Sequence, residues 1–181
     1  MKTTLTILIL ALNGTCFSTP LDQIIKSLDS GQKSERAEAV AALNNTIDNN
    51  KLSNEARLEA IQIAKDMDVH ECGEIIIKYI DTHWVLKKSA MSFELNFTSV
   101  DAIISLGEKT VPSLIEALKK EDDDLRHRLL SYSLGRILKQ KPALAYIDKL
   151  LAEDVSAAEK QRLEAARAVI SVWADRDTPE K

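Results

Sequence analysis

The chain has 181 residues, of which 45% are hydrophobic and 29% are charged, and its formal net charge is −4. This length and composition suffice for one globular domain with its own hydrophobic core. The mildly acidic balance argues against nucleic acid or an anionic membrane as the main partner.

The first 18 residues have the layout of a secretory signal peptide. Lys2 supplies a positive start, and the apolar stretch 5–12 is too short to stay in a bilayer. Cys16 and Ser18 stand at positions −3 and −1 of a cleavage site before Thr19. We therefore expect a secreted or periplasmic protein without stable membrane insertion. A lipoprotein anchored through Cys16 and a first core helix interrupted at residues 13–14 are the alternatives.

Residues 19–80 carry apolar side chains at helical spacing, divided by helix start and stop signals. We expect helices over about 19–29, 34–47, 53–64 and 68–80. Ser53 should cap the third helix, and Asp68 and Glu71 have capping-box spacing at the start of the fourth. Cys72 lies on the apolar side of that helix and would be the sole cysteine after cleavage, so we expect a buried thiol and no internal disulfide.

The helical pattern fails between about residues 82 and 98. Apolar residues alternate there with polar ones from Met91 to Phe97. A lone strand has nothing to pair with in a helical protein, so we predict an ordered loop. Trp84 and Phe93 also make this loop a candidate binding segment, because binding residues favour long loops on a rigid frame.

Three amphipathic helices follow between residues 99 and 138. We expect Ser99 to cap the first and Gly107 to end it, and Thr110 to cap the second. The acidic run 121–124 should cap the third, over 123–138. That helix is apolar on most sides, which predicts burial between neighbours. The arc that stays polar or bare contains Asp124, Arg128, Ser131 and Gly135.

Two more helices are predicted over about 141–151 and 156–173. Ser156 and Glu159 have capping-box spacing at the start of the second. Residues 176–181 form a charged tail. Helices joined by short connections over residues 19–175 indicate an all-α protein of packed helical hairpins.

One stretch resembles the HEAT repeat, particularly its shorter bacterial form. The matching positions are Ala102-Ile103, Leu106-Gly107, Val111-Pro112, Leu114-Ile115, Asp122, Leu125-Arg126, Leu134-Gly135 and Ile137. The resemblance implies stacked antiparallel hairpins in an α-solenoid, or ARM-type superhelix, that offers an extended surface to protein partners. The pair Ala60-Ile61 returns 42 residues later as Ala102-Ile103, which suits one hairpin per repeat. The spacing from Arg126 to Leu134 is one residue longer than in the family, which leaves the register of Arg126 open.

No group of residues predicts a specific chemistry. His70-Glu71 looks like one His-Glu pair of deoxyhypusine hydroxylase, a HEAT-type di-iron enzyme that uses four such pairs. One His and one Glu cannot fill a coordination sphere, so we expect no metal, no cofactor and no enzyme activity. Asn44-Asn45-Thr46 and Asn96-Phe97-Thr98 match the glycosylation sequon, which matters only in a eukaryotic secretory pathway.

The leading functional hypothesis is therefore an exported, non-enzymatic scaffold that binds another protein. The candidate contact residues are Trp84 and Phe93 in the loop and Asp124, Arg128 and Ser131 on the 123–138 helix. The simpler interpretation of Asp124 and Arg128 is an i, i+4 pair on a solvated face. A periplasmic inhibitor or immunity protein is the first alternative, and a metal-dependent enzyme is the second.

Overall fold

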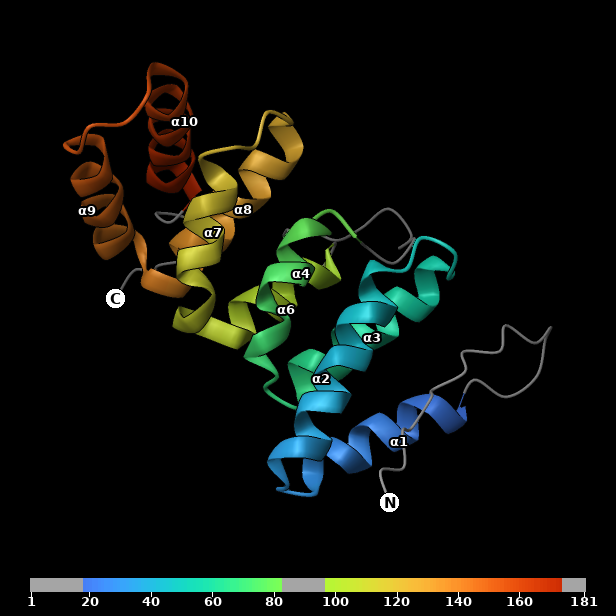
Figure 1. The fold of residues 1–181 in the computed structure, drawn as a ribbon. Helices are drawn as coiled ribbons and strands as arrows, with labels where there is room; N and C mark the ends of the chain where they lie inside the picture. The colour runs from blue at the N-terminus through green and yellow to red at the C-terminus, as the bar shows by residue number, and fades with distance from the viewer. Residues whose placement is uncertain (1–17, 83–96, 174–181) are drawn as a thin grey trace, which may run out of the picture.

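The computed structural model of the chain describes residues 18–82 and 97–173 (Figure 1). Every element in these two stretches is helical, and they contain no β-strand, which confirms the all-α prediction. The α-helices are α1 (Ser18–Asp29), α2 (Lys33–Asp48), α3 (Asn54–Asp66), α4 (Gly73–Lys78), α6 (Thr98–Leu106), α7 (Val111–Leu118), α8 (Asp124–Leu138), α9 (Gln140–Leu151) and α10 (Ala157–Trp173). The 3-10 helices η1 (His70–Cys72) and η2 (Gly107–Thr110) precede α4 and α7.

Three predicted helix caps are confirmed. The Ser53 hydroxyl accepts from the Ala56 N–H at the start of α3, at 3.3 Å. At α8, an Asp123 carboxylate oxygen accepts from the Arg126 N–H at 2.9 Å. The predicted capping box forms before α10, where Glu159 accepts from the Ser156 N–H at 3.0 Å. Each bond satisfies an N–H group that has no partner within its own helix.

The predicted helix over 68–80 is wrong at its start. Asp68 has a positive φ of 50°, so it turns the chain instead of capping a helix. The segment then forms η1 and the six-residue α4. Glu71 does not form the predicted capping box with Asp68. Its carboxylate instead accepts hydrogen bonds from Nε and Nη2 of Arg36 in α2. A tertiary contact has replaced the local cap.

Two further predicted caps are also wrong. Ser99 lies inside α6, fully buried, with its hydroxyl 3.5 Å from the Thr82 carbonyl oxygen. Thr110 does stand at the N-cap position of α7, but its side chain makes no capping bond, because its hydroxyl donates to the Gly107 carbonyl at 2.8 Å. Gly107 does end α6 as predicted, with a φ of 71° that favours glycine.

The helices pack in two rows. In one row α3 contacts α6 and α6 contacts α8; in the other, α2, α4, α7 and α10 contact one another in turn. Contacts of α2 with α3, α4 with α6, α7 with α8 and α8 with α10 join the rows. α1 packs on α2 at one end of the molecule, and α9 packs on α8 and α10 at the other (Figure 1).

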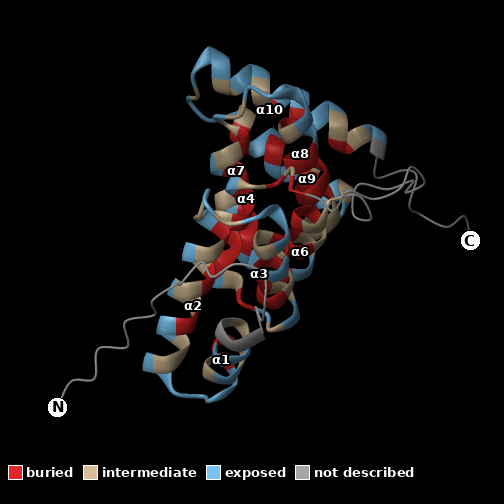
Figure 2. Cartoon of the chain, turned by 90° about the vertical axis from the view of Figure 1, so that its right-hand side faces the viewer, coloured by how far each residue is buried: buried red, intermediate tan, exposed pale blue. Residues whose placement is uncertain are grey.

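The hydrophobic core runs between the rows for the length of the molecule, as the buried residues in Figure 2 show. Its largest fully buried side chains come from both rows: Leu43, Ile47, Leu58, Ile61, Ile76, Ile80, Ile103, Leu114, Leu118, Leu129, Leu130 and Leu134. Each such side chain contributes about 1.5–3 kcal/mol by leaving water. The predicted burial of the third helix is confirmed, because α8 is covered by α6, α7, α9 and α10. No helix in the described residues has the length and apolar character needed to cross a membrane.

Candidate interaction surface

The sequence-predicted contact residues fall into three groups. Trp84 and Phe93 lie outside the described residues. Asp124 and Arg128 are exposed on the first turns of α8 and form an ion pair with each other. Leu125, next to Asp124 in the chain, is 40% exposed, whereas the other leucines of the described stretches are buried or half-buried. This end of α8 therefore stays available as a contact surface.

Ser131 is not on that surface. It is fully buried, and its hydroxyl donates to the His127 carbonyl at 2.7 Å. The bare arc predicted on this helix is closed by α10, because the position of a Cβ on Gly135 would lie 3.5 Å from the Ile170 side chain. The lack of large side chains on this arc reflects close helix packing, not exposure to solvent.

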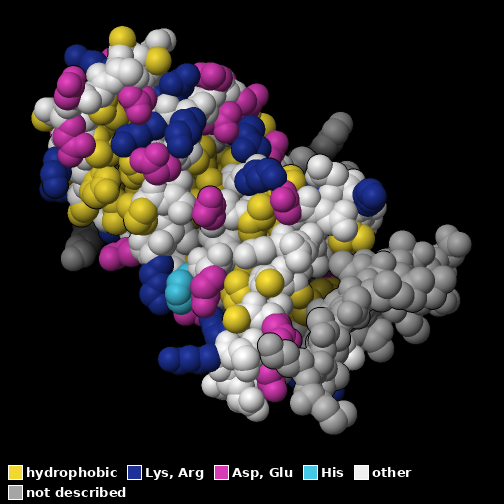
Figure 3. Space-filling model, viewed as in Figure 1, with side chains coloured by type: hydrophobic (Ala, Val, Ile, Leu, Met, Phe, Trp, Pro, Cys, Tyr) yellow, Lys and Arg dark blue, Asp and Glu magenta, His cyan; other side chains and the backbone are white. Residues whose placement is uncertain are grey.

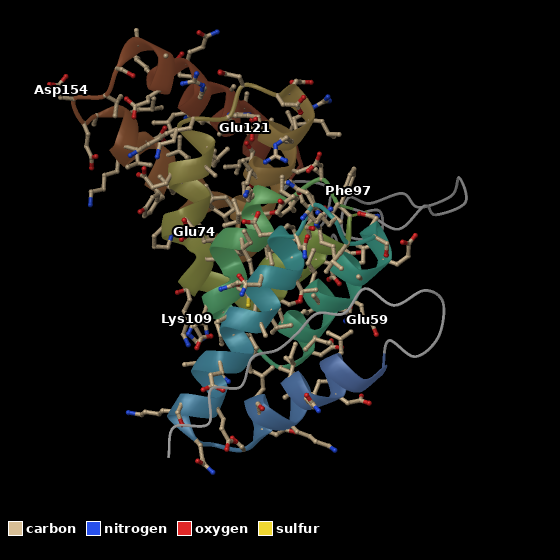
Figure 4. The ribbon with its side chains drawn as sticks, turned by 45° about the vertical axis from the view of Figure 1, so that its right-hand side comes forward. Glu59, Glu74, Phe97, Lys109, Glu121 and Asp154 are labelled. Carbon is tan, nitrogen blue, oxygen red and sulfur yellow. The ribbon has the colours of Figure 1, made fainter. Side chains whose placement is uncertain are left out.

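The acidic run before α8 binds cations of this chain. Arg126 donates to Glu121 at 2.9 Å, to Asp81 at 2.7 Å and to the Lys78 carbonyl at 3.0 Å. Asp122 accepts instead from Arg162 of α10, whose Nη1 also donates to a backbone carbonyl at the end of α7. These arginines tie the ends of α4 and α7 to α8 and α10. Figure 4 labels Glu121 within this group.

The same pattern recurs at the end of α2. There the Arg57 Nε donates to the Ile47 carbonyl at 2.7 Å. The Arg57 guanidinium also stacks on the Tyr79 ring, 4.3 Å from its centroid. Asp122 and Arg126, two of the residues that carry the sequence resemblance, therefore join helices of this chain.

A surface that sequence reasoning missed lies where α2 and α4 meet. The Arg36–Glu71 pair, with an Nη2–Oε2 distance of 3.2 Å, marks one end of this seam. At the other end the Tyr79 hydroxyl donates to Asp48 at 2.8 Å. Val40 comes between Arg36 and Asp48 along α2, and Ile75 comes between Glu71 and Tyr79 along η1 and α4, so both belong to the stretch between these two polar contacts.

Val40 and Ile75 are only half-buried, as is Ala117 on the next helix of the row, α7. Hydrophobic side chains accordingly reach the surface among charged ones on the face that α2, α4 and α7 present in Figure 3. We call this face the α2–α4–α7 face. From sequence alone, Val40 and Ile75 were assigned to buried stripes, and no local signal distinguishes a half-covered position from a covered one.

A cluster of charged groups lies at one end of this face, where α2, η1 and η2 meet. The Lys109 ammonium is 3.4 Å from Nδ1 and 3.5 Å from Nε2 of His70. The His70 Nδ1 is 3.7 Å from Glu71. Burial alone would raise the pKa of Glu71, but hydrogen bonds from its own backbone N–H and from Arg36 outweigh burial and lower that pKa. Glu71 is therefore an anion already engaged by Arg36.

Two other sequence motifs have structural explanations. Cys72 is fully buried, as predicted, and burial followed by the charge of Glu71 raises the pKa of its thiol to about 12. Asn44 of the first sequon lies within α2 and is half-buried, with its side-chain oxygen buried. Asn96 of the second sequon lies outside the described residues.

In the two described stretches, no group of three or more His, Cys, Asp or Glu residues is arranged to hold a metal ion.

Comparisons with protein-family models, with curated proteins and with solved structures gave no match.

Proposed function

We propose that this protein is an exported, non-enzymatic scaffold of HEAT-like helical hairpins that binds another protein through the α2–α4–α7 face. The proposed export depends on residues 1–18, which have the n-region, apolar stretch and small-residue site of a secretory signal. The proposed binding depends on the fold and on the character of this face.

The order of helix contacts supports a repeat architecture. An α-solenoid places each helical hairpin against the preceding and following ones, which produces two rows of the kind described above. The pairs Ala60-Ile61 and Ala102-Ile103, 42 residues apart, occupy neighbouring helices of one row, α3 and α6, and all four residues are fully buried. A repeated sequence pair thus has a repeated place in the packing.

The observation that carries the binding proposal is the partial exposure of Val40, Ile75 and Ala117 on three successive helices of one row. Half-buried aliphatic side chains bordered by ion pairs have the composition of a protein interface, with an apolar centre and a polar rim. Helical-repeat proteins in general use such extended faces of stacked helices to bind partners.

Capture from the exported fraction tests the proposal, with the full-length protein as bait. Ile75→Glu places a charge on the α2–α4–α7 face, and Leu125→Glu places the same charge on the exposed start of α8 as the matched control. We expect Ile75→Glu to lose a partner that wild type and Leu125→Glu both retain. Thermal melts must first show that both variants are folded. Loss with Leu125→Glu alone would move the site to α8, and equal capture by both variants would refute the proposal.

The export step has its own test. N-terminal sequencing of protein recovered from the exported fraction should begin at Thr19. An intact Met1 on all of the protein, with none outside the cytoplasm, would remove the exported location and leave the binding face to be tested separately.

A further inference from the structure

Lys109 differs from the described lysines that form ion pairs. Lys65, Lys78 and Lys119 each pair with a carboxylate, on Asp101, Asp48 and Glu116 respectively. Among the described residues, Lys109 pairs with no carboxylate, and its ammonium is directed at the two ring nitrogens of His70. An ammonium carries three N–H donors, and a neutral imidazole nitrogen can accept only one of them.

The charges around Lys109 do not cancel. Arg36 and Lys109 are basic side chains, and within the described stretches Glu71 is the one carboxylate that forms an ion pair with the group. Both oxygens of that carboxylate are engaged by Arg36, at 3.3 and 3.2 Å. Leaving the imidazole aside, the described part of the cluster therefore has two basic side chains and one carboxylate.

Other acidic side chains lie nearby in sequence but are not in contact with the cluster. Glu74 is exposed on α4, and Figure 4 shows it further along the face than Lys109. Glu108 is exposed beside Lys109 in the chain, and Glu35 is half-buried beside Arg36. In the described part of the chain, none of these three forms an ion pair with Arg36, His70 or Lys109.

We infer that Arg36, His70 and Lys109 form a binding site for an oxyanion, a carboxylate or phosphate group, at one end of the α2–α4–α7 face. Such a group would accept hydrogen bonds from the Lys109 ammonium and from a ring N–H of His70, next to the guanidinium of Arg36. The inference deepens the proposed function, on which it rests, because it defines the chemistry that a partner offers here. A carboxylate from the partner is one source of this chemistry, and free inorganic phosphate is the other.

Nitrogen-15 NMR of the imidazole rings in the full-length protein tests the site directly. Inorganic phosphate is titrated at constant pH and constant ionic strength, and the His70 signals are assigned from their loss in His70→Gln. We expect a saturable shift of His70 with a dissociation constant on the order of 1 mM, within reach of so small a ligand. His127 is buried in α8 and serves as the internal control, whose signals should stay unchanged.

Three variants make the result specific. Lys109→Ala should weaken binding about tenfold or more, Lys109→Arg should retain it, and Lys141→Ala, an exposed lysine on α9, should have no effect. A second titration uses an acetylated, amidated peptide of Glu and Ala. Tighter binding of the peptide assigns the site to a partner's carboxylates, whereas tighter binding of phosphate assigns it to the free anion.

Several results would overturn the inference: no saturable shift with either ligand, equal binding by Lys109→Ala, or matching shifts of His70 and His127. The capture experiment with Ile75→Glu does not involve these groups. The oxyanion site can therefore fail while the proposed binding face stands, and the two experiments distinguish that outcome from failure of the binding face itself.

Discussion

Two buried glycines of this chain should respond oppositely to replacement by alanine. A Cβ built on Gly73, at the start of α4, would lie 2.8 Å from the Thr110 Cγ2 methyl group. A Cβ on Gly135, in α8, would lie 3.5 Å from Ile170, which is ordinary van der Waals contact. Real Cβ atoms do not approach another carbon as closely as 2.8 Å, so one of the two elements must move.

Thr110 cannot easily turn away from Gly73. It is 2% exposed, and its hydroxyl is held by the bond to the Gly107 carbonyl at 2.8 Å. Overpacking of this kind costs about 1–3 kcal/mol. The gain in helix propensity from glycine to alanine offsets up to about 1 kcal/mol of that cost. We therefore expect Gly73→Ala to lower the free energy of unfolding by about 1–2 kcal/mol and Gly135→Ala to leave it unchanged or raise it slightly.

Urea denaturation followed by far-ultraviolet circular dichroism measures these differences. Thr110→Ser removes the clashing methyl group but keeps the hydroxyl, and by itself should cost about 1 kcal/mol for the lost buried methyl. The double variant Gly73→Ala/Thr110→Ser should then be about as stable as Thr110→Ser alone, which is a strongly non-additive result. Wild-type stability of Gly73→Ala in the presence of Thr110 would refute the close approach of α4 and η2.

Other expectations concern α8 and the thiol. Arg126→Ala should lower the free energy of unfolding in urea by about 1–3 kcal/mol, because it removes hydrogen bonds to two carboxylates and a carbonyl. Arg128→Ala, which removes an exposed ion pair, should lower it by about 0.5 kcal/mol or less. Equal losses in the two variants would contradict the role of Arg126 in joining α4 to α8. Burial lowers the pKa of His127, while its bond to a backbone carbonyl opposes the shift, so the unfolded chain takes up this proton first as pH falls. The contribution of His127 to the free energy of unfolding should then be complete above about pH 6.5 and should decrease as the pH falls below that value. His127→Gln should make this decrease smaller. Cys72 should resist a thiol reagent in the native protein and react on unfolding, so fast native labelling would contradict its burial.

Local sequence signals were sufficient for much of the helical structure. Ser53, Asp123 and the Ser156–Glu159 pair cap their helices as predicted, because a capping bond joins residues two or three apart and needs no other part of the chain. The helical periodicity similarly predicted most of the buried positions, including Cys72. Helix existence, helix caps and the apolar stripes are thus properties of short segments.

The candidate sites were harder to predict, because exposure depends on which helices become neighbours. Ser131 and Gly135 were predicted on a polar or bare arc, but Ser131 is fully buried and Gly135 packs against Ile170 of α10. Nothing near residue 131 in the sequence could indicate that cover. The half-exposed Val40 and Ile75 show the opposite case, since both fit a buried stripe and only the packing of α2 beside α4 leaves them partly open.

The amino-acid sequence alone was enough to predict an all-helical chain, most of its apolar stripes and the caps at Ser53, Asp123 and Ser156, because these follow from bonds and spacing within one or two turns. The tertiary structure decided which polar groups meet. Arg36 reaches a carboxylate 35 residues away, and Arg126 reaches a carbonyl 48 residues away. Such pairs form only after the stripes are buried and the helices take their places in the rows, so the surface chemistry of this protein is a consequence of its packing.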